Sequence, residues 1–186
     1  RDVIRCNERI CANSASVGFD ARVGTDVHKY SDIPVIGGAT GYVASLAVNF
    51  VKGLHCHMRI SGCGAARDGE YTMVCVCNGR YYGGGFNPVP EADPCAGVMA
   101  ILVVGAVPRY KAAGMVLAYS KGRYRDMPDY ITPLRGTSLD IAFDTESVVN
   151  IDGEAVYGRD IHMELIHSGV NFIAPRGMTF FDKQNS

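Results

Sequence analysis

The carboxylate of Glu154 is a side chain whose type and position suit acid–base chemistry. It follows Asp152 and Gly153 in the string VNIDGE, residues 149–154, where an apolar strand pattern ends and Asp-Gly is typical of a tight hairpin turn. A carboxylate just beyond such a turn projects from the edge of a sheet, where it can take a proton from a hydroxyl group. An ordinary exposed hairpin has the same pattern, and Asp152 also suits hydrogen bonding within a turn.

A second candidate is the glycine-rich string NGRYYGGGFNPVPEA at residues 78–92, with consecutive glycines at Gly83, Gly84 and Gly85. Glycine adopts left-handed backbone conformations at no steric cost, so this loop turns sharply or closely approaches something else. Phosphate-binding glycine loops continue into a lysine and a hydroxyl, or into a helix N-terminus. Residues 86–97 carry three prolines instead, so we expect no triphosphate site at this loop. A plain connection between strands is the alternative interpretation.

Histidine and cysteine side chains do not form a recognisable metal site in the sequence. Alternation places two histidines on one face of a strand and two cysteines on one face of another, but their spacings match no common zinc module. The side chains concerned are His55, His57, Cys63, Cys75 and Cys77. The chain has seven cysteines, an odd number, and no CxxC pair, which indicates reduced thiols in a cytoplasmic protein.

The elements that must position these residues are mostly strands. Short apolar runs with two-residue alternation are separated by glycine, proline, asparagine and aspartate. This pattern is typical of a mainly β protein with a largely antiparallel sandwich or barrel. The expected strands cover residues 9–17, 55–62, 70–78, 98–105, 138–144, 147–152 and 160–167, with a last pair near 170–174 and 178–181.

Apolar residues at helical spacing predict two helices. One covers residues 39–52, and the other begins at Pro108 and stops before Gly122. A short third helix is expected over residues 20–28, with Asp20 either capping it or facing a cleft.

Composition and charge exclude several classes of protein. The 186 residues, 47% hydrophobic and 20% charged, agree with a single compact domain over residues 1–186. A net charge of -1 without a basic run disfavours nucleic-acid binding. The longest apolar run, residues 98–107, is about half of the ~20 residues needed to span a bilayer and predicts a buried strand. No secretory signal opens the chain, which begins at Arg1 without a methionine, so we expect a fragment of a longer protein.

Four strings, in this order, resemble the C-terminal half of the diacylglycerol kinase family of soluble lipid kinases, relatives of sphingosine kinases and more distantly of NAD kinases. They are NSASVGFDA at residues 13–21, the glycine-rich loop at 78–92, VNIDGE at 149–154 and NFIAP at 171–175. The resemblance covers almost the whole chain. It implies an antiparallel β-sandwich with two or three packed helices, the second domain of the NAD kinase/diacylglycerol kinase-like fold.

The resemblance also implies roles for single residues. Glu154 matches the glutamate that is proposed to accept the proton of the lipid hydroxyl during its attack on the γ-phosphate of ATP. The residues then expected along the acceptor cleft are Asn78, Gly83, Gly84, Gly85 and Asp152.

An accessory magnesium site of the family is in doubt in this sequence. The family places an aspartate before a glycine at the start of a strand, and that carboxylate holds magnesium together with two backbone carbonyls. The matching position in residues 90–104 is Ala96, which leaves only the backbone carbonyls of Asp93 and Val98. Magnesium binds poorly without an anionic oxygen ligand, so the departure weakens the metal site but not the fold.

The nucleotide site of the family is not matched. Its GGDGT motif has only the counterpart GGATG at residues 37–41, which lacks the acid. We therefore expect ATP and Mg²⁺ to bind an upstream nucleotide-binding domain absent from this chain, and neither to bind this chain tightly. The leading hypothesis is the acceptor-side domain of a kinase for a lipid hydroxyl such as that of diacylglycerol, with peripheral membrane contact and homodimerisation as further expectations. The alternatives are a noncatalytic lipid- or partner-binding regulatory module and a kinase for a sphingoid base or a soluble nucleotide.

Overall fold

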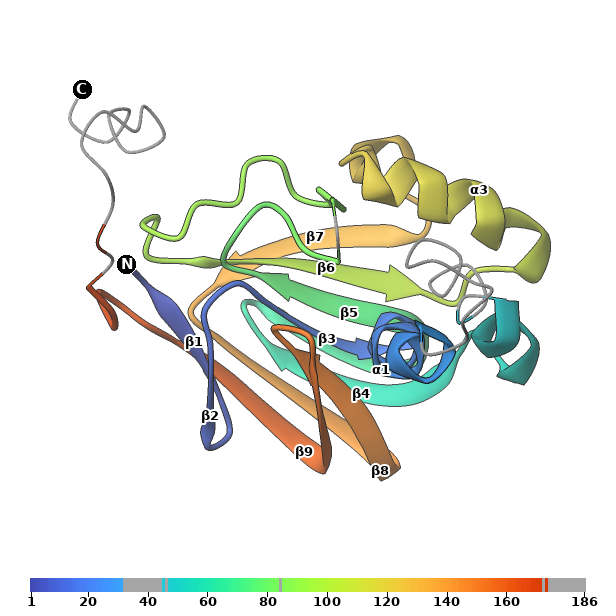
Figure 1. Cartoon of the computed structure of the whole chain (residues 1–186), viewed down its shortest axis with the longest axis horizontal. Coiled ribbons are helices and arrows are strands. Elements are labelled where there is room, and N and C mark those ends of the chain that lie inside the picture. Colours follow the sequence, from blue (N-terminus) through green and yellow to red (C-terminus); the bar gives the residue numbers. More distant parts are fainter. Residues whose placement is uncertain (32–44, 46, 84, 172, 174–186) are drawn as a thin grey trace.

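The chain forms one strongly curved antiparallel sheet with helices on its outer side (Figure 1). The structure is a computed structural model that describes residues 1–31, 45, 47–83, 85–171 and 173. Its strands are β1 (Val3–Cys6), β2 (Arg9–Cys11), β3 (Ser14–Gly18), β4 (Cys56–Gly62), β5 (Ala65–Cys77), β6 (Met99–Gly105), β7 (Ile131–Gly136), β8 (Ser138–Ile151) and β9 (Glu154–Ile166). The mainly β, sandwich-like fold expected from the sequence is confirmed.

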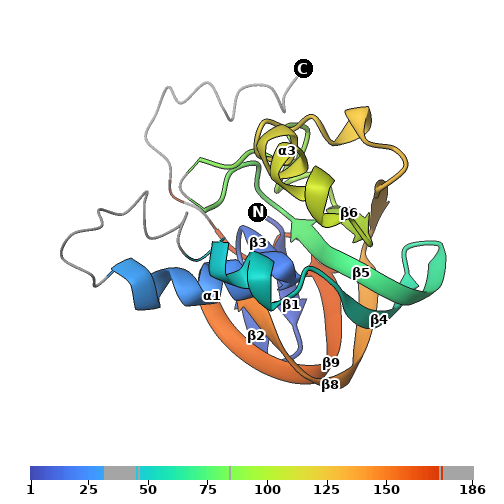
Figure 2. The ribbon, with the colours of Figure 1, turned by 90° about the vertical axis from the view of Figure 1, so that its right-hand side faces the viewer.

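The strand order is β2-β1-β9-β8-β3-β5-β6-β7, and β4 lies in line with β3. The long strands β5 and β8 each pair with β4 along one half and with β3 along the other. Figure 2 shows the resulting curl, in which β8 and β9 curve round beneath the other strands. The curled sheet therefore encloses a core between its own halves.

Two hydrophobic cores lie on the two faces of β5 and β6. Val74 and Ile101 belong to the core enclosed by the curled sheet, together with Phe143 of β8. Cys75 and Leu102 belong to a second core, beneath the helices. Strands that are buried on both faces need apolar residues at every position, which explains the unbroken apolar run predicted as a buried strand.

The helices cover the outer face of the sheet. They are α1 (Phe19–Ser31) and α3 (Arg109–Ser120), with residues 45 and 47–52 also helical and a 3-10 turn at Tyr124–Asp126. Both helices were predicted, although Pro108 lies just before α3, with extended backbone, rather than in its first turn. Of the helix expected over 39–52, residues 39–44 and 46 lie outside the described part. Among the described residues, no helix is both long and apolar enough to cross a bilayer.

Several strand boundaries differ from the prediction. The strand expected over 9–17 is broken after Cys11, and the two strands expected over 138–152 form the single strand β8, with an irregularity between Ala142 and Ser147. Strands β1 and β7 were not predicted. Strand β7 contains Pro133; among the described strands it pairs with β6 alone and so lies at an edge, where a missing N–H is tolerated.

Of the last two expected strands, the first is not formed in its described residues and the second is not tested. Val170, Asn171 and Ile173 lie in no strand, although the Val170 N–H donates to the carbonyl of Arg1 at 3.1 Å. The strand expected at 178–181 falls outside the described residues.

Candidate functional site

The β8–β9 hairpin ends in the tight turn that the sequence predicted. Asp152 and Gly153 both have positive φ angles, 51° and 99°, as a two-residue hairpin turn of the favoured type requires. The side-chain oxygen of Asn150 accepts the Gly153 N–H at 3.0 Å and closes the turn. Ile151 and Glu154 are paired across the hairpin, so the turn fixes the direction in which Glu154 leaves the sheet.

The carboxylate of Asp152 holds the turn that joins β2 to β3. It accepts the backbone N–H groups of Ala12 at 2.6 Å, Asn13 at 3.0 Å and Ser14 at 2.9 Å. The thiol of Cys11 also donates to it, at 3.3 Å. The pKa of this thiol is raised mainly by its burial and, to a smaller extent, by the negative charge of Asp152. Both oxygens of Asp152 are therefore occupied by donors of the protein.

Asn78, at the start of the glycine-rich loop, is fastened to the same β2–β3 turn. Its buried amide donates to the carbonyls of Asp2 and Ala12, each at 2.8 Å. Its backbone N–H and that of Gly79 donate to the Asn13 carbonyl. A Cβ at Gly79 would lie 2.0 Å from the Asn13 side-chain oxygen, so a larger residue there requires the Asn13 side chain to move. The structure thus brings Asn78 and Asp152 together through a turn that the sequence analysis did not single out.

The glycine-rich loop folds back on itself and reaches an apolar pocket. The N–H groups of Gly85 and Phe86 both donate to the Tyr82 carbonyl, at 3.1 and 2.9 Å. Gly83 and Gly85 have φ angles of 55° and 129°, which glycine adopts without strain, and Gly84 lies outside the described residues. This return places the Phe86 side chain in the pocket wall.

The apolar pocket lies between α1, α3 and the outer face of β5 and β6. Its volume is about 60 Å³, and Asp20 is the only carboxylic acid among the residues that line it. On the scale where one water needs roughly 10–15 Å³, it holds a few small groups. Its other lining residues include Phe19, Val23, Met73, Phe86, Ala112, Met115 and Tyr119.

Asp20 stands in the first turn of α1, at the wall of this pocket. Its carboxyl is hydrogen-bonded to Ser16 and Tyr82, and loss of hydration raises its pKa above the ordinary value, while the two hydrogen bonds act in the opposite direction. The Tyr82 hydroxyl lies 3.0 Å from that of Tyr119. The sequence left Asp20 open between a cap and a cleft residue, and the structure places it beside a cavity.

The side chain of Glu154 is exposed and forms no hydrogen bond or ion pair with a described residue. It lines neither the apolar pocket nor the two polar cavities near Arg22 and Arg135. Because directly paired residues share a face of a sheet, Glu154 leaves from the face of Ile151, which belongs to the enclosed core. The structure therefore does not bring Glu154 and the apolar pocket into one cavity.

The loop before β6 does not fit a magnesium ion. The Asp93 carboxylate accepts the Cys95 N–H at 3.0 Å, and its backbone carbonyl accepts the Ala96 N–H. The described residues contain no group of three or more acidic, histidine or cysteine side chains that could hold a metal. The Asp93 carbonyl already accepts an N–H, and Ala96 supplies no carboxylate at the position where the family has one, so we derive no step through this ion.

A carboxylate that the sequence analysis missed stabilises this loop. Asp2 is buried; its oxygens accept the N–H groups of Gly97 at 2.8 Å and Ser168 at 2.9 Å and contact the His167 ring at 2.8 Å. The N–H groups of Gly97 and Ser168 point at the Asp2 carboxylate, and such donors hold an anion in place but cannot coordinate a metal cation. An acid at the start of the chain carries no sequence signal for such a distant contact.

The histidines and cysteines considered as zinc ligands do not converge. His55 contacts the Val107 carbonyl at 2.8 Å, and His57 lies between Asp68 and Asp144. Cys75 and Cys77 contact each other within the second core, and all seven cysteines are free thiols.

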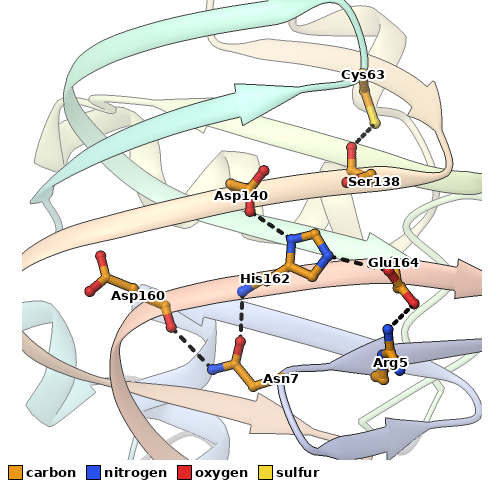
Figure 3. Close-up of polar contacts among 8 residues, drawn as sticks. All are labelled: Arg5, Asn7, Cys63, Ser138, Asp140, Asp160, His162 and Glu164. Atoms are coloured by element: carbon orange, nitrogen blue, oxygen red, sulfur yellow. Dashed lines mark hydrogen bonds and ion pairs between the residues drawn. The ribbon is translucent and has the colours of Figure 1, made fainter.

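A separate polar cluster ties β1 to the β8–β9 hairpin (Figure 3). His162 lies between Asp140 at 2.7 Å and Glu164 at 3.4 Å, and these two partners raise its pKa. Arg5 of β1 pairs with Glu164, and the Asn7 side chain bridges the backbone of β9. These contacts join neighbouring strands, so we assign them to the stability of the sheet.

The sequence is similar to those of proteins described as probable lipid kinases. A probable lipid kinase YegS-like protein of Stenotrophomonas maltophilia (strain K279a) is 26% identical over 167 residues, which are 90% of this chain and 53% of the relative. One from Yersinia enterocolitica is 24% identical over 164 residues, covering 88% of this chain and 53% of the relative. The chain thus spans about half the length of the curated relatives it matches.

Solved structures agree with this assignment at the level of the fold. A putative diacylglycerol kinase from Bacillus anthracis str. Sterne aligns with a TM-score of 0.65 at 21% identity, covering 89% of this chain and 53% of that one. A second structure described in the same words aligns at 0.57 and 19% identity, covering 89% and 51%. The sequence profile described as the YegS C-terminal NAD kinase beta sandwich-like domain matches residues 13–171. The chain therefore belongs to this family of C-terminal domains.

Proposed function

We propose that this chain is the acceptor-binding part of a lipid kinase, which transfers the γ-phosphate of ATP to a lipid hydroxyl such as that of diacylglycerol. The observation that carries the proposal is the apolar pocket with the single carboxyl of Asp20 at its wall. The names of the relatives, which are probable lipid kinases, support the reaction class.

The pocket suits an acceptor in which a hydroxyl is close to an apolar chain. Small-molecule sites combine apolar walls with a few polar groups that fix orientation. Asp20 and Tyr119 supply such groups at the pocket wall, while Met115 and Phe86 supply apolar wall. Tyr82 lies behind them, hydrogen-bonded to both Asp20 and Tyr119. The cavity holds only a few small groups. Met115, a flexible side chain, and Phe86, on the glycine-rich loop, must therefore move before an acyl chain can enter.

Glu154 is our proposed proton acceptor. Its carboxylate would take the proton of the acceptor hydroxyl as that oxygen bonds to the γ-phosphorus and the bond from phosphorus to the ADP oxygen breaks. The exposed carboxylate has no competing partner among the described residues and stands on a rigid hairpin. Glu154 and the apolar pocket share no cavity, so this role requires the acceptor hydroxyl to meet Glu154 outside the pocket. The nucleotide would be held there by an upstream domain that faces the hairpin.

Acceptor phosphorylation tests this function. The protein, with whatever sequence its gene encodes before Arg1, is incubated with radiolabelled ATP and either dioctanoylglycerol or glycerol. We expect label in the lipid product and none in glycerol, which lacks the apolar chains. Equal labelling of both acceptors, or of neither, would contradict the proposal, and labelling of sphingosine in place of dioctanoylglycerol would reassign the acceptor.

Filling the pocket should weaken acceptor binding. Ala112 is buried in its wall, and Ala112→Phe should raise the KM for dioctanoylglycerol by about tenfold or more, with the KM for ATP unchanged. Ala113→Phe, on the exposed side of the same helix, is the matched control and should leave both constants near wild type. A folded Ala112→Phe protein, checked by thermal unfolding, that retains the wild-type acceptor KM would exclude this pocket as the acceptor site.

The 186-residue chain alone should not bind ATP tightly. Its glycine-rich loop continues into residues 87–98 without a helix, and the first turn of α1 carries the carboxyl of Asp20, which disfavours an anion. Isothermal titration calorimetry with ATP and Mg²⁺ should show no binding in the micromolar range. A micromolar dissociation constant would show that this chain contains a nucleotide site of its own.

A further inference from the structure

We propose that the outer face of α3 is a docking surface for an anionic phospholipid bilayer; this rests on the proposed function, because it would bring the acceptor pocket to the membrane that contains the acceptor. The outer face is defined by five exposed residues, Tyr110, Ala113, Gly114, Leu117 and Lys121. Their spacing of three, four and seven residues places them along one side of the helix.

Both sides of α3 are apolar, although only one side packs on the sheet. Its inner side contributes Ala112, Met115 and Tyr119 to the pocket. On the outer side Tyr110 is 82% exposed and Leu117 is 60% exposed. A helix with apolar residues all round is normally covered on every side, so the exposed side chains indicate a surface that acquires a cover.

The positive charge around α3 indicates that the partner of its outer face is anionic. Residues 108–125 carry five cations and no acid, whereas the whole chain has a net charge of -1. The two cations after the helix, Arg123 and Arg125, pair with Asp126 and Glu91.

Arg109, Lys111 and Lys121, on the helix and at its end, are not paired with a described carboxylate. Arg109 donates to the Val51 carbonyl at 3.4 Å and Lys111 to the Tyr130 hydroxyl at 3.2 Å. Apolar side chains flanked by such cations fit the boundary between acyl chains and anionic headgroups.

The position of α3 fits the same occupant. The helix lies on the outer side of the sheet, at the opposite end of the molecule from the N-terminus (Figure 1). A further exposed apolar side chain, Val51 at 75%, belongs to the segment whose carbonyl Arg109 of α3 contacts. Tyrosine is favoured at the headgroup level, where Tyr110 would lie. A bilayer against this face would meet the helix that forms one wall of the acceptor pocket, which shortens the path of a lipid into it.

Vesicle flotation tests the docking surface on the 186-residue chain. The vesicles are phosphatidylcholine with or without phosphatidylserine. We expect flotation with the phosphatidylserine vesicles, little with phosphatidylcholine alone, and loss of binding in high salt. The double variant Tyr110→Ser/Leu117→Ser should reduce the bound fraction at least fivefold. The control Tyr157→Ser/Ile10→Ser removes one aromatic and one aliphatic side chain of similar exposure, 61% and 56%, and should bind like wild type.

Three results would overturn the inference. They are no flotation of the wild type with phosphatidylserine vesicles, equal flotation with both kinds of vesicle, and equal loss in the two double variants. A dimer, seen by size exclusion, that the Tyr110/Leu117 variant abolishes would show that a second copy covers the face instead. The vesicles contain neither ATP nor acceptor, and dioctanoylglycerol is assayed in solution, so docking and phosphorylation can fail separately.

Discussion

Replacing Glu154 with glutamine should lower the kcat for lipid phosphorylation roughly 100-fold or more in the protein that includes the upstream sequence. Glutamine keeps the size and hydrogen-bonding reach of the side chain but cannot take up the proton of the acceptor hydroxyl. Since the exposed Glu154 carboxylate forms no hydrogen bond or ion pair with a described residue, the change removes no polar contact of that side chain. We therefore expect the KM for ATP, the KM for dioctanoylglycerol and the thermal unfolding temperature to stay near wild type.

The matched control is Glu146→Gln. Glu146 is an exposed carboxylate of the same hairpin, on β8, so the substitution makes the same chemical change at a site with no proposed role. It should leave kcat within a few-fold of wild type. If Glu154→Gln does the same, Glu154 is not the base.

In that event the carboxyl of Asp20 is the next candidate, because it is the one acid in the pocket wall and its pKa is raised by burial. Asp20→Asn separates the two cases. If Asp20 only orients the acceptor, the variant should raise the acceptor KM more than it lowers kcat. If Asp20 is the base, kcat should fall while the acceptor KM changes little.

Local pattern in the sequence predicted the position of most strands, though not all of their bounds, and it predicted the hairpin turn. The unbroken apolar run at residues 98–107 predicted a strand buried on both faces, and β6 has a core on each side. Asp152-Gly153 predicted a two-residue turn, and both residues have the left-handed backbone that such a turn needs. In each case the signal is carried by neighbouring residues.

What could not be predicted depends on contacts between distant residues. The break between β2 and β3 is stabilised by Asp152, which lies about 140 residues further along the chain. The position of Asp20 at a pocket wall requires α1, α3 and the glycine-rich loop to meet. Asp2 acts through residues 97 and 168, which no local pattern relates to it. Contacts of side chains that join distant segments therefore cannot be predicted from the residues next to them in the sequence.

Asp152→Ala should destabilise the fold by about 3 kcal/mol, which corresponds to a fall in Tm of roughly 6–12 °C for a chain of this size. The alanine leaves the N–H groups of the β2–β3 turn without their charged acceptor, and the Ser14 N–H among them belongs to a buried residue. It also places a Cβ without polar compensation at a φ of 51°. Thermal and urea unfolding of the 186-residue chain measure the effect.

Asp152→Asn and Glu154→Gln complete the comparison. Asparagine tolerates the left-handed backbone and keeps one acceptor oxygen, so it should lose clearly less stability than alanine. Glu154→Gln, two residues away and without a partner among the described residues, should leave Tm unchanged. Equal stability of Asp152→Ala and wild type would mean that the turn holds without its carboxylate. With the expected outcome, the two acids of VNIDGE have separate tasks: Asp152 fixes the hairpin against the β2–β3 turn, so that Glu154 is held in one direction and is free to react.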